Sequence, residues 1–308
     1  MYRLSFQLDT ARVQLQGLHE VQIQSSVHEM TDTAVLRLPG NVGLSGGSLK
    51  NTFQEGDAVQ IQLGYDEVLH SVFKGYITKM THSIPLVLHL EDEMYALKKR
   101  AVLPMQFREK PLAVVLAYLG ISKYKAENIA LGNFTIDMSM NTVAKVLAKI
   151  KEKYNVTVFF RAGILHVGNA YTGGKNHKFH IQSQIIDTDL NYCMPSSIPL
   201  QVEIQWQLPN GEVLNHCVGK AGGEKQVITF TGLNPLDLAN TAKRAYEKLT
   251  KSGFQGEITT FGTPCVQHGD TVELLDDLGE KTGKYSVEAV KRSFGTNGYR
   301  QTLSLVQL

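Results

Sequence analysis

The chain has few of the residues that mark disulfide-rich, membrane-spanning or strongly basic proteins. It contains three cysteines, Cys193, Cys217 and Cys265, and an odd, sparse set favours reduced thiols over a disulfide framework. Its 31 basic and 29 acidic side chains give a net charge of +2, which argues against a protein that grips nucleic acid mainly by neutralising phosphates. The longest mostly apolar stretch, residues 111–121, is shorter than the about 20 residues of a membrane span, so we expect no stable membrane insertion.

The N-terminal residues lack the apolar block of a secretory signal peptide and alternate like a strand instead. We therefore expect synthesis and folding in the cytoplasm. Hydrophobic residues make up 43% of the chain and charged residues 19%, which is typical of a globular protein and excludes wholesale disorder. A length of 308 residues suggests about two domains.

Residues 1–99 are predicted to form a β domain. Val59, Ile61 and Leu63 alternate with glutamines, and residues 21–26 show the same period of two. Several short strands joined by tight loops favour an antiparallel barrel or sandwich.

Residues 100–172 change to a helical period. Pro111 suits the start of one helix and Gly120 its end, and Asn141 is positioned to cap a second helix. The second helix has an apolar stripe at helical spacing, formed by Val143, Val146, Leu147, Ile150 and Tyr154, and its lysines are interpreted as a solvated face. A hairpin over residues 156–167 completes a small helix-plus-hairpin insert domain of mixed α/β structure.

Residues 173–308 return to the strand pattern from about residue 177. The apolar positions between Leu200 and Trp206 alternate, a long helix is predicted over residues 234–249, and strands resume at Phe254. The overall prediction is an α+β, mainly β chain in which two antiparallel β domains flank the insert.

A repeat relates the two β domains. Gly56-Asp57 and Gly269-Asp270 each follow an aromatic or aliphatic residue by three positions and precede an alternating strand. Glycine tolerates a positive φ angle and aspartate bonds to backbone amides, so both pairs suit tight turns. These four residues, with Gly75 in the strand after the first turn, are the candidate structural turn residues. Two unrelated barrels that share common turn chemistry remain the alternative.

Residues that could carry chemistry occur in unsuitable contexts. Ser45 matches the G-x-S-x-G pattern in a loop that lacks the strand and helix of a nucleophile elbow. His177 and His180 would face opposite sides of a strand, with no further ligand to complete a metal site. The acidic clusters at residues 91–93 and 276–277 fall at strand ends, where solvated turns are expected. We predict no catalytic, cofactor-binding or metal-binding residue.

The ordered set of motifs resembles a known family. Residues 53–77, with Gly56-Asp57 and Gly75, are similar to the first tube-like barrel of phage baseplate hub proteins of the late control protein D family, which are related to the N-terminal hub region of VgrG. Residues 256–274, with Gly269-Asp270, resemble the start of the second tube-like barrel, and residues 142–160 resemble the insert domain between them.

This resemblance implies a structural, non-enzymatic hub in the tail baseplate of a virion or of another contractile injection machine, assembled in the bacterial cytoplasm. It implies a homotrimer whose six barrels adapt a hexameric tail tube protein to a trimeric spike. The chain ends in the strand around Leu305, so the spike is expected to be a separate protein. Other baseplate proteins would be partners, and tape-measure protein and DNA would pass through the lumen. No cofactor is implied.

Two other classes of function remain open. A tail-associated cell-wall hydrolase would use the acids Glu91 and Glu93 or the Ser45 loop. A carbohydrate-binding module at the tail tip would need solvent-facing aromatic residues, whereas the single tryptophan, Trp206, lies in an alternating strand where burial is expected.

Overall fold

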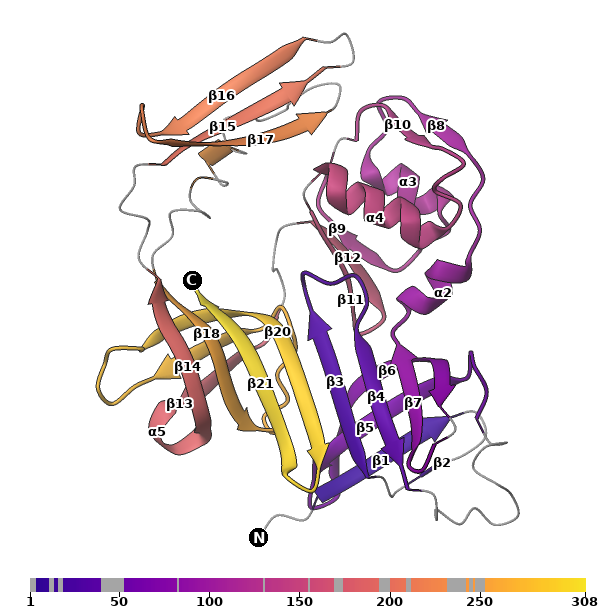
Figure 1. The fold of residues 1–308 in the computed structure, drawn as a ribbon, viewed down its shortest axis with the longest axis vertical. Helices are drawn as coiled ribbons and strands as arrows, with labels where there is room; N and C mark the ends of the chain where they lie inside the picture. The colour runs from indigo at the N-terminus through magenta and orange to yellow at the C-terminus, as the bar shows by residue number, and fades with distance from the viewer. Residues whose placement is uncertain are drawn as a thin grey trace.

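The computed structural model describes residues 4–10, 14–15, 19–39, 53–81, 83–129, 131–154, 156–168, 174–193, 200–208, 212–231, 242–243, 246 and 253–308. Strands dominate the described chain, with a few short helices between them (Figure 1). The chain is therefore a mainly β protein of the α+β class, as its sequence predicted. None of the helices described is both long enough and apolar enough to cross a membrane.

The first β unit comprises the strands of residues 4–91. These are β1 (Leu4–Thr10), β2 (Gln14–Leu15), β3 (Glu20–Ser26), β4 (Thr33–Leu38), β5 (Ala58–Tyr65), β6 (Val68–Thr81) and β7 (Leu86–Glu91). They follow the order β3-β4-β7-β6-β5-β1-β2, and all pairs are antiparallel. Val59, Ile61 and Leu63 are buried in its core while the glutamines between them are half-buried, because successive side chains of a strand face opposite sides.

The second β unit comprises strands from residues 176–193 and 253–307. These are β13 (Asn176–His180), β14 (Ile185–Cys193), β18 (Gly253–Phe261), β19 (Thr271–Leu275), β20 (Gly283–Gly295) and β21 (Gly298–Gln307), with the single-turn helix α5 (Ile181–Gln184) between β13 and β14. Their order is β14-β18-β21-β20-β19-β13. A separate core of aliphatic and aromatic side chains fills this unit, including Phe179, Val272 and Tyr285.

The two β units share one topology. Counted along the chain from one to six, with the two-residue β2 left out, the strands of both units follow the order two-three-six-five-four-one. Both units also carry a bulge in the fifth strand, at Thr78 in β6 and at Glu288 in β20. The units differ in strand one, which pairs antiparallel with strand four in the first unit and parallel with it in the second. No pairing among the described residues joins β1 to β3 or β13 to β14, so the hydrogen bonds seen there do not close either ring as a complete barrel requires.

One sheet of 13 strands runs through both β units (Figure 1). The cause is β20, a strand of 13 residues. Its first part pairs with β19, and its second part, from Ala289 to Phe294, pairs antiparallel with β3 of the first unit. Strands at opposite ends of the sequence therefore form the seam between the units.

The insert comprises residues 94–168 and has its own core. Its elements are α2 (Met94–Lys99), β8 (Met105–Phe107), α3 (Leu112–Tyr118), β9 (Tyr124–Ala126), β10 (Phe134–Ile136), α4 (Val143–Tyr154), β11 (Thr157–Arg161) and β12 (Ile164–Gly168). Helices α3 and α4 lie where the apolar stripes indicated, whereas α2 was not anticipated. Asn141 was wrong as the cap of α4: the Thr142 hydroxyl accepts from the Lys145 amide, and the Asn141 side chain accepts from Lys145 Nζ instead.

Residues 200–231 form a third sheet, apart from the 13-stranded one. It consists of β15 (Leu200–Gln207), β16 (Val213–Gly219) and β17 (Glu224–Thr231), with β15 in the centre. Val202 and Ile204 pack with Ala242 in a small core, and Trp206 is half-buried against it. Of the helix predicted over residues 234–249, only residues 242, 243 and 246 are described, all of them helical, and the rest lies outside the described residues.

Candidate functional site

The first Gly-Asp turn, Gly56-Asp57, lies directly before β5 and is hydrogen-bonded to β6. Gly56 has a φ angle of +90°, and its amide donates to the Ile77 carbonyl at 2.7 Å. The Ile77 amide donates to the Asp57 carbonyl at 3.0 Å, and Asp57 Oδ2 accepts from the Gln54 amide at 2.9 Å. The side chain of Asp57 thus holds the turn that Gly56 makes possible.

The second Gly-Asp turn has the same set of hydrogen bonds as the first. Gly269 has a φ angle of +79°, and its amide donates to the Val287 carbonyl at 2.7 Å. The Val287 amide donates to the Asp270 carbonyl at 2.9 Å, and Asp270 Oδ2 accepts from the Gln267 amide at 2.8 Å. Ile77 and Val287 each directly precede the bulge of their strand. The repeat in the sequence therefore corresponds to one structural element that occurs twice.

Gly75 serves a different purpose from the two turn glycines. It lies within β6, and a Cβ atom there would come within 2.1 Å of the Glu91 carbonyl oxygen of β7. A glycine at this position allows the two strands to approach closely.

Aromatic side chains close the seam between the β units. Tyr299, at the start of β21, packs in the core of the first unit together with Phe294. The Tyr65 hydroxyl donates to the Tyr299 carbonyl at 2.5 Å and accepts from the Gly262 amide at 3.2 Å. A Cβ atom at Gly262 would lie 2.1 Å from the Tyr299 ring. The tip of the β20–β21 hairpin is thus part of both units.

The second turn also anchors the insert, through the side chain of Asp270. Asp270 forms an ion pair with Arg161, at the end of β11, and its Oδ2 accepts a hydrogen bond from Nε2 of His177 in β13 at 3.0 Å. Arg161 Nε also donates to the Gln267 side chain at 3.3 Å. The Asp270 side chain is 1% exposed, and we call this group of Arg161, His177, Gln267 and Asp270 the Asp270 joint.

The charge of Asp270 is well stabilised. Burial by itself raises the pKa of its carboxyl, but the hydrogen bonds from His177 and the Gln267 amide, together with the Arg161 charge, outweigh burial and lower the pKa to about 2. His177, one of the two histidines considered as metal ligands, is thus engaged in this joint, while His180 is exposed. The described residues contain no group of three or more side chains suited to hold a metal ion.

A buried pair of carboxyls lies beside the Asp270 joint. Asp92 is 4% exposed, its Oδ2 accepts from the Asp32 amide at 3.1 Å, and its Oδ1 accepts from the Met94 amide at 3.0 Å. In return, the Asp92 amide donates to the Asp32 carbonyl at 3.1 Å. The expectation of a solvated turn at residues 91–93 was therefore wrong for Asp92, because the insert and the loop between β3 and β4 cover it.

Burial dominates the acid–base properties of this pair. It raises the pKa of Asp92 to about 8, with repulsion from Asp32 adding to it, and it raises the pKa of Asp32 as well. His268, next to the second Gly-Asp turn, reaches the pair with Nδ1 at 3.9 Å from Asp32 Oδ2. Burial, with the nearby Arg161 charge, lowers the pKa of His268 to about 4, so the ring is neutral at pH 7. Its Nε2 must carry the proton, since it faces the Phe160 carbonyl at 3.2 Å.

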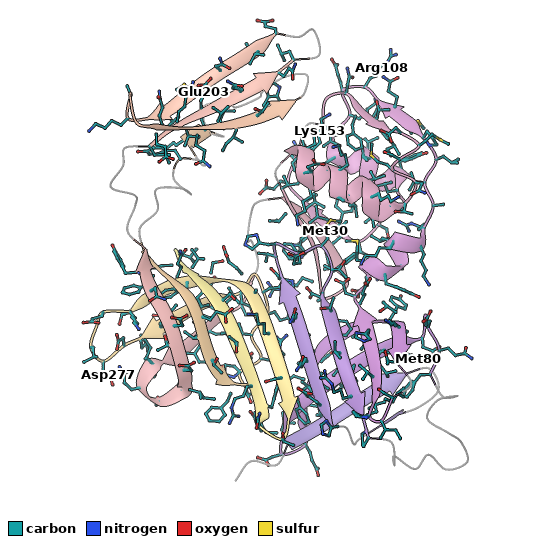
Figure 2. The ribbon with its side chains drawn as sticks, in the orientation of Figure 1. Met30, Met80, Arg108, Lys153, Glu203 and Asp277 are labelled. Atoms are coloured by element: carbon teal, nitrogen blue, oxygen red, sulfur yellow. The ribbon has the colours of Figure 1, made fainter. Side chains whose placement is uncertain are left out.

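The remaining sequence candidates are not brought together into a site. The Ser45 loop lies outside the described residues. Glu91 forms an ion pair with Lys98 at 2.7 Å. Asp276 accepts hydrogen bonds from the amides of residues 278 and 281, and Asp277 is exposed at the outer end of the second β unit (Figure 2). Residues 276–277 thus form a solvated turn.

The fold matches that of solved tail proteins. A tail protein from Neisseria meningitidis superimposes with a TM-score of 0.72 and 16% identity over 99% of this chain and 96% of that chain. A 43 kDa tail protein of prophage MuSo2 from Shewanella oneidensis gives a TM-score of 0.67 and 13% identity over 98% of both chains. A chain of the Francisella PdpA-VgrG complex gives 0.57 and 10% identity, with 100% of this chain matching 58% of that chain.

No protein-family model and no curated protein matches the sequence. At identities this low, the structural likeness establishes the shared fold. The resemblance to hub proteins of the late control protein D and VgrG type is confirmed at that level.

Proposed function

We propose that this chain is a structural baseplate hub of a contractile tail or related injection machine, located in the virion tail baseplate. The observation that carries the proposal is the repeated β unit, with one strand order, one bulge position and one hydrogen-bonded Gly-Asp turn in both copies. Three chains with two such units each would present six similar surfaces to a hexameric tail tube, while the trimer matches a three-fold spike.

The free edges of the sheet support ring formation. At one end of the 13-stranded sheet, β14 pairs only with β18 among the described strands, and at the other end lie β1 and β2. Unpaired strand edges are prone to associate with other chains, and a closed ring of subunits satisfies them. Ile186, the extra residue in the register shift of β14, is 47% exposed on that edge strand. We therefore place a subunit contact at β14.

The other parts of the proposal follow from the hub role. The division into residues 1–99, 100–172 and 173–308 places a β domain on either side of the insert. A trimeric spike protein binds the hub, other baseplate proteins contact its outer surface, and tape-measure protein and DNA pass through the lumen. The chain carries out no reaction, and its assembly takes place in the bacterial cytoplasm.

Light scattering coupled to gel filtration tests the oligomeric state, and electron microscopy tests the ring. We expect an annular trimer, whose mass falls to that of a monomer in Ile186→Lys because a charge on the edge strand opposes pairing. Ile84→Lys is the matched control, since Ile84 is 88% exposed in the turn between β6 and β7 of the first unit. A stable monomer that joins neither tail tube nor spike protein would contradict the proposal.

A peptidoglycan turbidity assay separates this role from that of a cell-wall hydrolase. We expect no clearing by the wild-type protein. Clearing that is abolished by Glu91→Ala or Glu93→Ala would assign the chain to the enzymes instead.

A further inference from the structure

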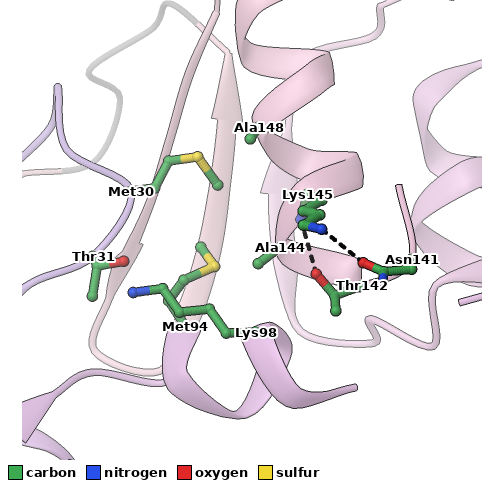
Figure 3. Close-up of a pocket in the computed structure, with 9 residues that line it drawn as sticks. All are labelled: Met30, Thr31, Met94, Lys98, Asn141, Thr142, Ala144, Lys145 and Ala148. Carbon is green, nitrogen blue, oxygen red and sulfur yellow. Dashed lines mark hydrogen bonds between the residues drawn. The ribbon is translucent and has the colours of Figure 1, made fainter. Parts of the chain in front are cut away.

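A groove lies in the corner between the first β unit and the insert (Figure 3). Its volume is about 530 Å³, within the range of ligand sites. The half-buried Met30 comes from the loop between β3 and β4 and the exposed Ala148 from α4, while Met94 of α2 and Ala144 of α4 lie buried beneath them. The accessible apolar groups are thus the thioether of Met30 and the methyl of Ala148, from two separate elements. We call this feature the corner groove.

Lysines stand at the mouth of the corner groove. Lys98 of α2 is paired with Glu91, and the Lys145 ammonium of α4 contacts the neutral Asn141 side chain at 2.9 Å. Figure 3 shows Lys145 on the side of α4 that faces Asn141 and Thr142. Because its hydrogen-bond partner is uncharged, the positive charge of Lys145 is not neutralised there.

The insert as a whole is strongly basic, although the chain is almost neutral. Residues 94–168 contain twelve basic and four acidic side chains, a surplus of eight positive charges, whereas the whole chain has a surplus of two. Figure 2 labels two of these basic residues, Arg108 and Lys153, on the insert. Such a concentration of one sign attracts partners of the opposite sign and speeds their association.

We propose that the corner groove binds an acidic amphipathic helix of a partner protein. Apolar side chains of the helix would lie between Met30 and Ala148, while its carboxylates would face Lys145 and the basic surface of the insert. This is the helix-in-groove mode of recognition, and the Met30 side chain can adapt to different apolar side chains. The inference does not depend on the hub assignment.

The shape of the groove favours a helix over two other anionic partners. A membrane surface is broad and flat, whereas the groove floor lies in a corner between two folded units, as the lining from both units indicates. A single-stranded nucleic acid would need aromatic platforms for its bases, and the groove lining contains no aromatic side chain.

Fluorescence anisotropy with a synthetic probe tests the proposal on the full chain. The probe is a labelled peptide of about 15 residues, four helical turns, with leucine at positions i, i+3, i+4 and i+7 and glutamate elsewhere. A peptide with lysine in place of glutamate is the charge control. We expect saturable binding of the acidic peptide that weakens with added salt, and no binding of the basic peptide.

Three variants locate the binding. Ala148→Glu places a charge on an exposed position of the groove wall, and Lys145→Glu reverses the charge at its mouth, so each should weaken binding at least about tenfold, or about 1.4 kcal/mol. Lys123→Glu makes the same charge change at an exposed residue of the insert outside the groove lining and should change binding less than about twofold. Unchanged circular dichroism and melting temperature confirm that each variant is folded.

Three results would overturn the proposal. One is absence of binding by the acidic peptide at low salt. Another is an equal loss in Lys123→Glu, which would show general attraction to the insert. The third is binding of phosphatidylglycerol vesicles that Ala148→Glu and Lys145→Glu abolish while peptide binding persists, which would assign the groove to lipid.

Discussion

The Asp270 joint offers the sharpest test of how the insert is held. Asp270→Asn keeps the shape of the side chain and a carbonyl oxygen that can still accept from the Gln267 amide, but it removes the charge opposite Arg161 and His177. Asp57→Asn makes the same change in the first turn, where Asp57 accepts from the Gln54 amide at 2.9 Å as Asp270 accepts from the Gln267 amide at 2.8 Å. Asp270→Asn in addition removes the Arg161 ion pair to the insert and alters the hydrogen bonds that Asp270 accepts from His177 and the Lys175 amide within the second unit.

Two arguments give the loss of stability expected for Asp270→Asn. A pKa lowered from 3.8 to about 2 corresponds to about 2 kcal/mol of stability at neutral pH. Removing one member of a buried ion pair destabilises proteins by about 3–5 kcal/mol, and Arg161, at 16% exposure, can recover part of this by turning toward water. We expect Asp270→Asn to reduce the free energy of unfolding by about 2–4 kcal/mol and Asp57→Asn by about 1 kcal/mol.

Urea denaturation followed by circular dichroism, together with amide hydrogen exchange, measures the difference. Exchange should accelerate on both sides of the joint, in β11 and in β13, only in Asp270→Asn. The pH dependence provides an independent check. Because the pKa of Asp270 is lowered in the folded state, its contribution is present above the ordinary carboxyl value and is lost as the pH falls through about 2. Equal destabilisation by the two substitutions, or exchange unchanged in β11, would refute the reasoning.

Three further predictions concern the carboxyl pair, the second turn and the seam. Because the pKa of Asp92 is raised in the folded state, its contribution to stability is present at low pH and is lost as the pH rises through about 8. The free energy of unfolding, measured by urea titration, should therefore fall by about 1–2 kcal/mol between pH 6.5 and 8.5. Asp92→Asn should reduce this dependence on pH. Gly269→Val should prevent the second β unit from folding, as seen in solubility and near-ultraviolet dichroism. Gly279→Val has the same φ of +79° but no atom within 4 Å of the added Cβ, so it should lower the melting temperature through backbone strain alone and leave the unit folded. Equal effects of the two substitutions would contradict a role for the packed turn. Tyr65→Phe removes both hydrogen bonds at the seam and should lower stability by about 1–2 kcal/mol in urea melts, and an unchanged midpoint would show that the ring alone holds the seam.

Short-range patterns in the sequence predicted the individual elements well. The alternation of Val59, Ile61 and Leu63 with glutamines marked a strand with one buried face, and the stripe from Val143 to Tyr154 marked α4. Such patterns predict structure because a strand repeats every two residues and a helix every 3.6 residues. An element with one buried face therefore has apolar residues at regular spacings in the sequence. The sequence also showed the Gly-Asp repeat, since the two residues are adjacent and the aspartate side chain accepts from an amide three positions earlier.

The sequence did not predict the buried carboxyl pair of Asp32 and Asp92, because its burial depends on contacts between residues that are far apart in the sequence. Asp92 has acidic neighbours on both sides and resembles a solvated turn, yet the loop containing Asp32 and the start of α2 enclose it. No residue near Asp92 in the sequence indicates this cover. The only signal was that Asp92 lies two residues before the start of α2, where its carboxyl can accept from a backbone amide of the helix.

Sequence alone therefore determined the strands, two helices and the duplicated turn, because each is set by interactions among near neighbours. Tertiary structure decided that β20 pairs with β3 across more than 260 residues of sequence and joins the two units in one sheet. It also decided that β15 to β17 form a sheet of their own, and that Asp270 forms an ion pair with Arg161 of the insert. A strand pattern specifies which face is buried but not which edge it pairs with, and the charge state of a buried acid depends on whatever folds over it.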